Sequence, residues 1–83
     1  MAEKLIGTVV HYYGKAGVAG IVLSGRMKVG DTVRFKGHTT DFSETVESMQ
    51  IEHETVAKAK KGDDVGIRVS DRVRIHDEVY RVD

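Results

Sequence analysis

Apolar and polar residues alternate along much of this chain, and this two-residue period restricts its fold more than any other feature. Val33 and Phe35 alternate with polar neighbours over residues 32–36, and the valine and isoleucine residues of 65–70 alternate with glycine, arginine and serine. Successive side chains of a β-strand point to opposite faces of a sheet, so the pattern indicates strands with one buried face. Glycines end most of these segments, as expected where strands meet at tight turns. The sequence therefore predicts an all-β fold.

Two segments near the N-terminus, at about 5–13 and 18–24, carry apolar residues on both faces, and we expect central strands or strands covered on their outer side. Further strands are predicted at 46–51, where a bulge would turn Val46, Met49 and Ile51 inward, at 72–76 and at 79–82. Only 55–61 has a helical spacing, over one or two turns, and no internal repeat is evident. The regular strands are expected to bury Val33, Phe35, Val65, Ile67, Val69, Val73 and Ile75.

The chain length is enough for one hydrophobic core and no more. We therefore interpret all 83 residues, 1–83, as a single domain. Short strands separated by glycine turns favour a small closed β-barrel with six to seven strands. Closure would remove the exposed strand edges that promote aggregation.

The composition excludes several classes of site. There is no cysteine, and hence neither a disulfide nor a thiolate metal site is possible. No apolar run approaches the ~20 residues of a membrane helix, and the N-terminus lacks the apolar run of a signal peptide, so we expect a soluble, complete, cytoplasmic protein with no membrane partner. No metal and no cofactor are expected either, because metal-ligand spacing is absent from the histidines, which are His11, His38, His53 and His76.

The net charge is zero, but the charges are unevenly distributed along the chain. Basic residues predominate over 1–40, whereas 41–54 contain acidic residues and no lysine or arginine. This asymmetry indicates either a molecule with one basic and one acidic side, or two segments that pair and neutralise each other.

Four segments, in order, resemble the second domain of translational GTPases such as elongation factor Tu. Residues 6–10 resemble its first strand, 27–33 (Met-Lys-Val-Gly-Asp-Thr-Val) its turn-and-strand segment, 46–49 its next strand, and 59–67 its Ala-x-x-Gly-Asp-x-Val-Gly strand. The resemblance implies the β-barrel of that domain, which contacts ribosomal RNA and the acceptor end of aminoacyl-tRNA in those proteins. The residues of that tRNA pocket are not found at matching positions. A phosphate-binding loop is also missing, so no bound nucleotide is expected.

Three further segments are similar to the small C-terminal barrel of the collagenase-like peptidase family, and this likeness is the stronger one. They are residues 12–19, with Tyr12-Tyr13 and Gly17-Val18-Ala19, followed by 37–42 and 46–53. Some members of that family are linked to RNA hydroxylation. Nothing in the chain resembles the catalytic domain of those proteins, so the resemblance implies an appended module without catalysis of its own.

Cations occupy outward positions of the predicted strands. Arginine on a sheet face suits phosphate because its planar guanidinium can donate two hydrogen bonds to a pair of oxygens. Small barrels bind nucleic acid through such a face, aided by stacking aromatic residues. The alternative is a solvated face whose cations pair with carboxylates across the strands. A short basic run at 58–61 could extend the face. The candidate nucleic-acid-binding residues are Arg34, Lys36, Arg68, Arg72, Arg74 and Tyr12.

The most distinctive loop of the chain is 37–42. Its polar residues could form a recognition surface anchored by Phe42, or they could simply satisfy backbone groups at a tight corner. The candidate recognition residues are His38, Thr39, Thr40 and Asp41.

Two hypotheses on function follow, and neither is an enzyme. The first is a non-catalytic module that binds structured RNA or the ribosome, in translation or RNA modification. The second is a protein-interaction module that docks onto a larger enzyme or forms a homo-oligomer, which the zero net charge and the acidic segment favour. Catalysis is the least favoured reading, because no nucleophile, general base and oxyanion donors occur together.

Overall fold

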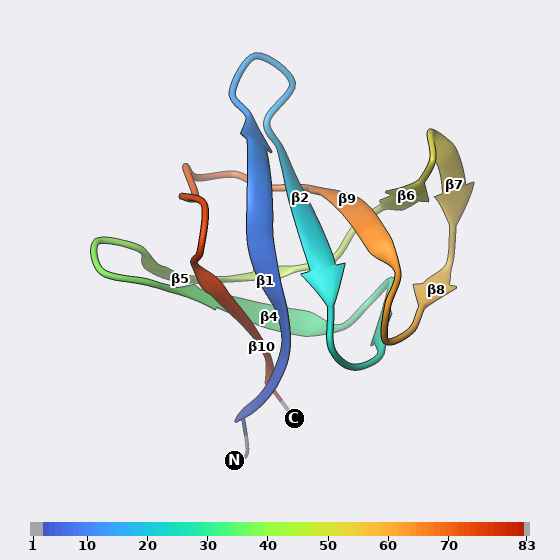
Figure 1. The fold of residues 1–83 in the computed structure, drawn as a ribbon, viewed down its shortest axis with the longest axis horizontal. Helices are drawn as coiled ribbons and strands as arrows, with labels where there is room; N and C mark the ends of the chain where they lie inside the picture. The colour runs from blue at the N-terminus through green and yellow to red at the C-terminus, as the bar shows by residue number, and fades with distance from the viewer. Residues whose placement is uncertain (1–2, 83) are drawn as a thin grey trace.

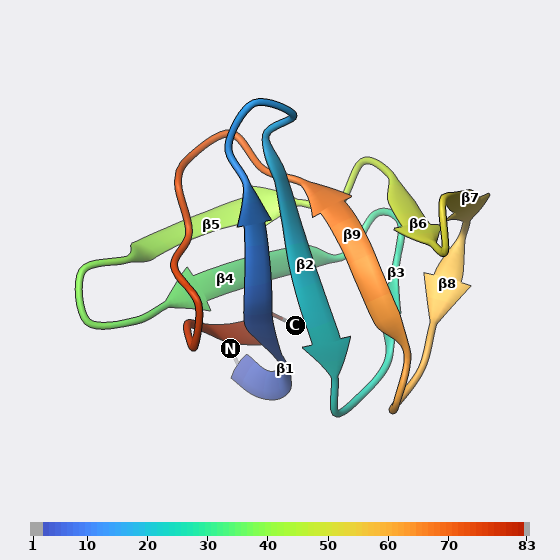
Figure 2. The same cartoon turned by 45° about the horizontal axis from the view of Figure 1, so that its top comes forward.

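The computed structural model describes residues 3–82, and over these residues it contains ten β-strands and no helix, which confirms the all-β class. Eight strands form one antiparallel sheet in the order β5-β4-β10-β1-β2-β9-β6-β7, while β3 and β8 pair in a separate two-stranded ribbon (Figure 2). The strands are β1 (Glu3–Tyr13), β2 (Val18–Leu23), β3 (Met27–Lys28), β4 (Thr32–Lys36), β5 (Asp41–Thr45), β6 (Met49–Ile51), β7 (Glu54–Val56), β8 (Lys58–Ala59), β9 (Asp64–Arg68) and β10 (Glu78–Val82).

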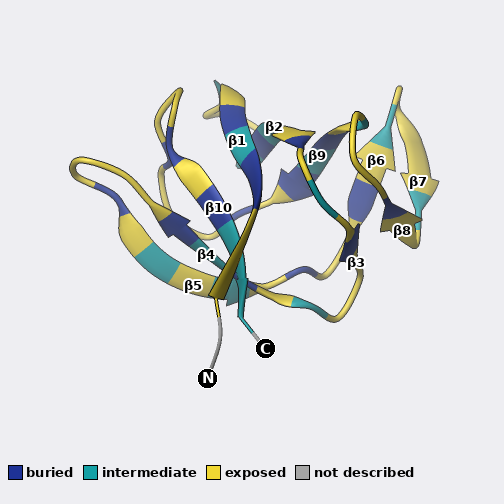
Figure 3. Ribbon diagram, turned by 60° about the horizontal axis from the view of Figure 1, so that its bottom comes forward, coloured by how far each residue is buried: buried dark blue, intermediate teal, exposed yellow. Residues whose placement is uncertain are grey.

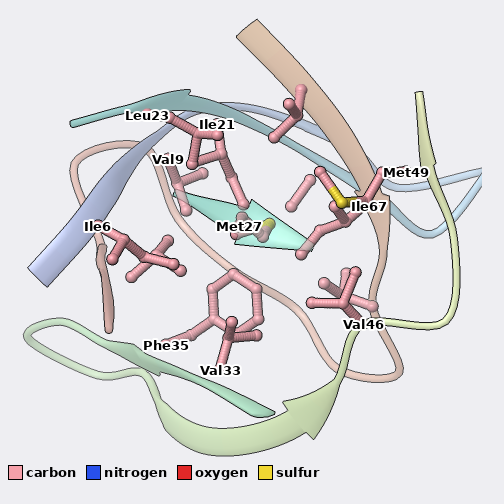
Figure 4. Packing of buried hydrophobic residues seen from close by; sticks show 14 of the residues in the cluster. Ile6, Val9, Ile21, Leu23, Met27, Val33, Phe35, Val46, Met49 and Ile67 are labelled. Atoms are coloured by element: carbon pink, nitrogen blue, oxygen red, sulfur yellow. The ribbon is translucent and has the colours of Figure 1, made fainter. Parts of the chain in front are cut away.

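The core lies between two parts of this one curled sheet. In Figure 1, β1 passes in front of β4, and β2 and β9 follow beside β1 in the sheet. Figure 4 shows the side chains that fill the space: Val33 and Phe35 on β4 face Val9 and Ile21, with Met27 between them. All five are at most 1% exposed. Burial of this apolar surface is the main term that stabilises the fold.

The alternation of burial along the strands follows the predicted period (Figure 3). All the residues that the regular strands are expected to bury are buried except Ile75, which is 54% exposed. The inward prediction for Ile75 is wrong because 72–76 is not a strand. The chain turns there instead, with the Asp77 N–H donating to the Arg74 carbonyl at 3.1 Å. Val73, which precedes the turn, is buried as expected.

Two local predictions differ from the structure. Residues 55–61 form no helix, because Lys58 and Ala59 pair with Lys28 and Met27 across the ribbon and this pairing overrides the local spacing. The predicted bulge in 46–51 is a break between β5 and β6, where the Val46 N–H donates to the Asp31 carbonyl at 2.9 Å. The break still buries Val46 and leaves Ile51 half-buried.

The predicted closed barrel of six to seven strands is not confirmed. Strands β5 and β7 stand at the two ends of the eight-stranded sheet, and no pairing joins them within residues 3–82. The sheet is therefore open. At β5, a side chain and not a neighbouring strand makes the contact. The Glu44 carboxylate on β5 accepts the Ser70 N–H at 3.0 and 3.1 Å.

One turn geometry recurs three times, although no repeat was expected from the sequence. In each copy a cationic residue donates its backbone N–H to the carboxylate of an aspartate three residues later, and the aspartate N–H returns to the carbonyl of the cationic residue. The residue before the aspartate has positive φ, as the third position of a type II turn requires. The three copies, each with its flanking buried residues, are Met27–Val33, Ala59–Val65 and Val73–Val79.

The third copy is the most buried and the most tightly connected. Asp77 is 5% exposed, and its carboxylate accepts the Arg74 N–H at 2.8 Å. Its carbonyl accepts the Val9 N–H, and the His76 N–H donates to the Val9 carbonyl, both at 2.8 Å. A Cβ atom at Gly37 would overlap the Asp77 carboxylate, which explains a glycine there. This turn thus connects β1, β10 and the end of β4.

The two ends of the described chain lie side by side. Glu3 pairs with Val82 and Lys4 with Arg81 at the start of β1 and the end of β10, and both ends are at the same side of Figure 1. Within residues 3–82, no helix has the length and apolar character needed to span a membrane.

Replacing Asp77 by alanine is expected to lower the free energy of unfolding more than the same change at Asp31 or Asp63. The part-buried Arg74 N–H would lose its acceptor, at a cost of about 1–3 kcal/mol. The corresponding bonds to Asp31 and Asp63 are exposed, so water can replace those acceptors more readily. Urea unfolding followed by circular dichroism measures the differences, with the exposed Asp64→Ala as control. Equal losses at the three turns would contradict the special role of Asp77.

Candidate functional site

A row of four paired residues crosses the outer face of the sheet over four adjacent strands, and its two central residues are glycines. His11 on β1 lies opposite Gly20 on β2, Gly20 opposite Gly66 on β9, and Gly66 opposite Gln50 on β6. Because the two central positions have no side chains, the sheet is hollowed there. The resulting depression, of about 690 Å³, is here called the trough and is lined by Val10, His11, Tyr13, Ala16, Val18, Gly20, Ile21, Val22, Gln50, Glu52, His53, Asp64, Val65 and Gly66.

The walls of the trough carry apolar side chains that face solvent. Tyr13 is 54% exposed, Val22 39% and Val10 37%. The sequence predicted apolar residues on both faces of β1 and β2, and both strands are central as expected, but nothing in the described chain covers these outer residues. Contiguous exposed apolar surface of this kind marks interaction sites on soluble domains.

The two glycines of the trough have close neighbours. A Cβ atom at Gly20 would lie 3.2 Å from the His11 Cβ, and one at Gly66 would lie 3.3 Å from a Val18 methyl group. Larger residues would therefore press on the wall as well as fill the floor. Glycine at both positions keeps the floor at backbone level, where a partner side chain can approach closely.

One end of the trough is formed by a strained hairpin turn. Ile51 pairs with Glu54, so Glu52 and His53 form the two-residue loop between β6 and β7, with φ of 51° and 67°. Such loops favour Asn-Gly because both central residues need positive φ. Residues other than glycine and asparagine in this conformation cost stability, and such strain concentrates at functional sites.

The charged residues around the trough are acidic or histidine. Glu52 and Asp64 contribute carboxylates, His11 and His53 contribute imidazoles, and the lining contains neither lysine nor arginine. The His11 and Tyr13 rings lie beside each other, with centroids 5.8 Å apart. The surface therefore combines an apolar floor and walls with an anionic rim.

Arg34, a predicted phosphate-binding residue, is occupied by carboxylates. Its guanidinium forms a two-bond ion pair with Asp41, at 2.8 and 2.9 Å, and a further one with Glu3 at 3.1 Å. The Arg34 hydrogen bonds hold the pKa of the Asp41 carboxyl below its ordinary value of 3.8, and the Arg34 pKa is raised by both carboxylates, Asp41 first. Pairing with carboxylates across the strands is the alternative to phosphate binding that the sequence left open for the strand cations.

The structure does not bring the other predicted cations onto one face. Arg68 ends β9, which is separated from β4 and its Lys36 by three strands in the sheet order. Arg72 and Arg74 lie in the connection between β9 and β10. All four side chains are exposed.

The remaining predicted site residues also lie apart from one another. Tyr12 is half-buried and packs against the core. In the loop, His38 and Thr39 are exposed, whereas Thr40 is 6% exposed and its carbonyl accepts the Gly37 N–H at 2.7 Å. Asp41 begins β5 and pairs with Arg34. Within residues 3–82 no group of three or more His, Cys, Asp or Glu side chains could hold a metal ion.

The fold and its surfaces are those of a small β-module, and comparison with known proteins identifies the class. Residues 17–76 match the family described as elongation factor Tu domain 2, so the chain belongs to that family. The chain is 47% identical over 76 residues to an uncharacterized protease of Methanocaldococcus jannaschii, covering 90% of this chain and 19% of that protein. It is 36% identical over 83 residues to a collagenase of Porphyromonas gingivalis, covering 98% of this chain and 23% of that protein.

Solved structures agree on the fold. Two crystal structures of the C-terminal domain of a U32 peptidase-type protein from Geobacillus thermoleovorans superpose with TM-scores of 0.90 and 0.87, at 19% and 20% identity. They cover 96% and 92% of this chain, and 93% and 96% of theirs. The resemblance to elongation factor Tu domain 2 and to the C-terminal barrels of collagenase-like peptidases is confirmed. The chain spans about a fifth of the length of the curated relatives that it matches.

The Arg34–Asp41 pair predicts a specific acid response. Because the Asp41 pKa is lowered in the folded protein, the pair stabilises the fold at pH values above the ordinary aspartate pKa and is lost as the pH falls through the lowered value. Asp41→Asn should therefore lower the urea midpoint at neutral pH, and the difference from the unchanged protein should fade at acid pH. A difference that is independent of pH would contradict this origin.

Proposed function

We propose that this chain is a non-catalytic docking module that binds a larger U32 peptidase-type polypeptide through the trough. The observation that carries the proposal is the exposed apolar surface around the paired glycines Gly20 and Gly66, on an otherwise well-packed small domain. A surface of this kind is stabilised when a partner covers it.

The relatives support a larger polypeptide as the partner. In the curated relatives the matching segment is about a fifth of the protein, and it is accompanied by a much longer polypeptide. The larger polypeptide is therefore the proposed occupant, whether it continues the same chain or is a separate one. The anionic rim formed by Glu52 and Asp64 favours a contact segment that carries a lysine or arginine next to an apolar side chain.

The strained turn supports a binding role for this end of the trough. Glu52 and His53 occupy positions where asparagine and glycine would fit with less strain, and both residues line the trough. The strain at these two residues supports a contact to a partner, since stability is commonly lost where function requires it.

RNA or ribosome association is a second hypothesis, and it rests on Arg68, Arg72 and Arg74, which are exposed in the structure. Under it, replacing Arg68 and Arg74 by alanine would abolish RNA binding and leave the fold intact. Binding through phosphate contacts would also weaken steeply with added salt. The cytoplasmic location and homo-oligomer formation are likewise hypotheses.

Val22→Lys is expected to abolish docking, because it places a charge on the apolar wall of the trough. Affinity capture of the tagged protein from its native extract, after ribonuclease treatment, should recover a U32 peptidase-type polypeptide with the unchanged protein and not with this variant. The matched control is Ile75→Lys, which makes the same change at a 54% exposed isoleucine outside the trough. Equal recovery with both variants, or recovery that ribonuclease prevents, would refute docking through the trough.

The double change Glu52→Asn with His53→Gly should have opposite effects on stability and docking. Relief of the two positive-φ residues should raise the free energy of unfolding by roughly 1 kcal/mol, while loss of the two side chains should weaken capture of the partner. Thermal unfolding and the same capture experiment measure the two effects. A variant that is more stable and docks as before would show that the turn has no part in recognition.

A further inference from the structure

A basic groove lies beside the two-stranded ribbon, away from the trough. It is a depression of about 940 Å³ between the ribbon of β3 and β8, the start of β1 and the end of β10. Figure 2 shows β3 and β8 at the same side of the molecule. It is lined by Lys4, Arg26, Met27, Lys28, Asp31, Lys58, Ala59, Lys60, Asp63 and Arg81, and it shares none of these residues with the trough.

The groove concentrates positive charge in a protein whose net charge is zero. Six cationic side chains line it together with two carboxylates. Both carboxylates are engaged in their turns: Asp31 accepts the Lys28 N–H and Asp63 accepts the Lys60 N–H, each at 3.0 Å. Arg81 donates to the Arg26 carbonyl at 3.2 Å, which holds its guanidinium at the edge of the groove.

Two of the lysines are placed at a cost to stability. Lys28 and Lys58 lie directly opposite each other across the ribbon, and like charges in directly opposed positions are destabilising. In the part of the chain that the structure describes, neither side chain forms an ion pair that would compensate. A bound polyanion would remove the repulsion, because it would bring negative charge between the two ammonium groups.

We infer that this groove binds the phosphate backbone of a single-stranded nucleic acid without base selectivity. A phosphodiester chain carries a negative charge at each nucleotide, and it can therefore contact cations on both walls of the groove at once. Four of the six cations are lysines, which bind phosphate as point charges and do not require one fixed geometry of the anion. The lining contains no aromatic ring that could stack on a base, so the contacts position a backbone and read no sequence.

The test is fluorescence anisotropy of labelled oligothymidine and oligouridine over a range of salt concentrations. Both probes should bind with similar affinity at low salt. The logarithm of the binding constant should fall linearly with the logarithm of the salt concentration, with a slope no steeper than about −4, the limit for six single-strand phosphate contacts. Absence of binding to either probe at low salt would overturn the inference.

The decisive variant is Lys58→Glu, because it should change stability and binding in opposite directions. Lys28 would gain an opposite charge across the ribbon, so the melting temperature should rise. The affinity for both oligonucleotides should fall by roughly tenfold or more, since one cation is lost and one anion is gained in the groove. The matched control is Lys15→Glu, an equal change of charge at an exposed residue outside the groove.

Three outcomes would contradict the inference even if oligonucleotides bind. An equal loss of affinity in Lys15→Glu would show attraction to the molecule as a whole instead of to the groove. Competition by polyglutamate at concentrations as low as those of unlabelled oligothymidine would indicate an acidic protein partner. Tighter binding of a duplex than of its single strands would exclude the groove as a single-strand site. Because the trough is unchanged in Lys58→Glu, docking of the larger polypeptide should persist in this variant, and so the two proposals can fail separately.

Discussion

The structure depends most on a turn in which an aspartate carboxylate accepts the backbone N–H three residues before it. Three such turns lead into β4, β9 and β10. The turn at Asp77 matters most because β10 lies between β4 and β1 in the sheet order. If β10 were not held there, the sheet would separate into a part with β4 and β5 and a part with the remaining strands, and the core between them would be open to water. The chain has no cysteine for a disulfide and no helix within residues 3–82, so it has few other means of fixing this corner.

The core and most strands could be predicted from the sequence because burial imposes the alternation that the sequence displays. The burial of Val33 and Phe35 can be predicted from their spacing alone. The turn around Ile75 was missed because His76 stands where Gly30 and Gly62 stand in the other two copies, which removes the usual signal of positive φ. The threefold repeat of the turn is not evident in the sequence for the same reason, because its third copy has histidine in place of glycine. One or two helical turns are predicted at 55–61 because the partner of this segment, β3, is distant in the sequence and local spacing contains no information about it.

The surfaces could be predicted much less well than the core, for a related reason. The trough exists because Gly20 and Gly66 become neighbours, and the basic groove exists because Lys28 and Lys58 do. Each pair joins residues that are 30 or more positions apart in the chain. From the sequence, Arg34 is a reasonable phosphate ligand. The fold places Glu3 and Asp41 beside it, and both carboxylates form ion pairs with its guanidinium. The charge of single residues is visible in a sequence, whereas the neighbours that neutralise or reinforce it are set by strand order.

The pairing of Glu3 with Val82 has a consequence for how such a domain is joined to other polypeptide. A domain whose entry and exit points coincide can be added at an end of a protein or inserted into a surface loop with little distortion of its host. Here that point of attachment lies next to Lys4 and Arg81, on the edge of the basic groove and not of the trough. Any polypeptide fused at either end therefore emerges beside the groove. Its length and charge would control access to the groove, and the trough, which shares no residue with it, would stay free to engage a partner.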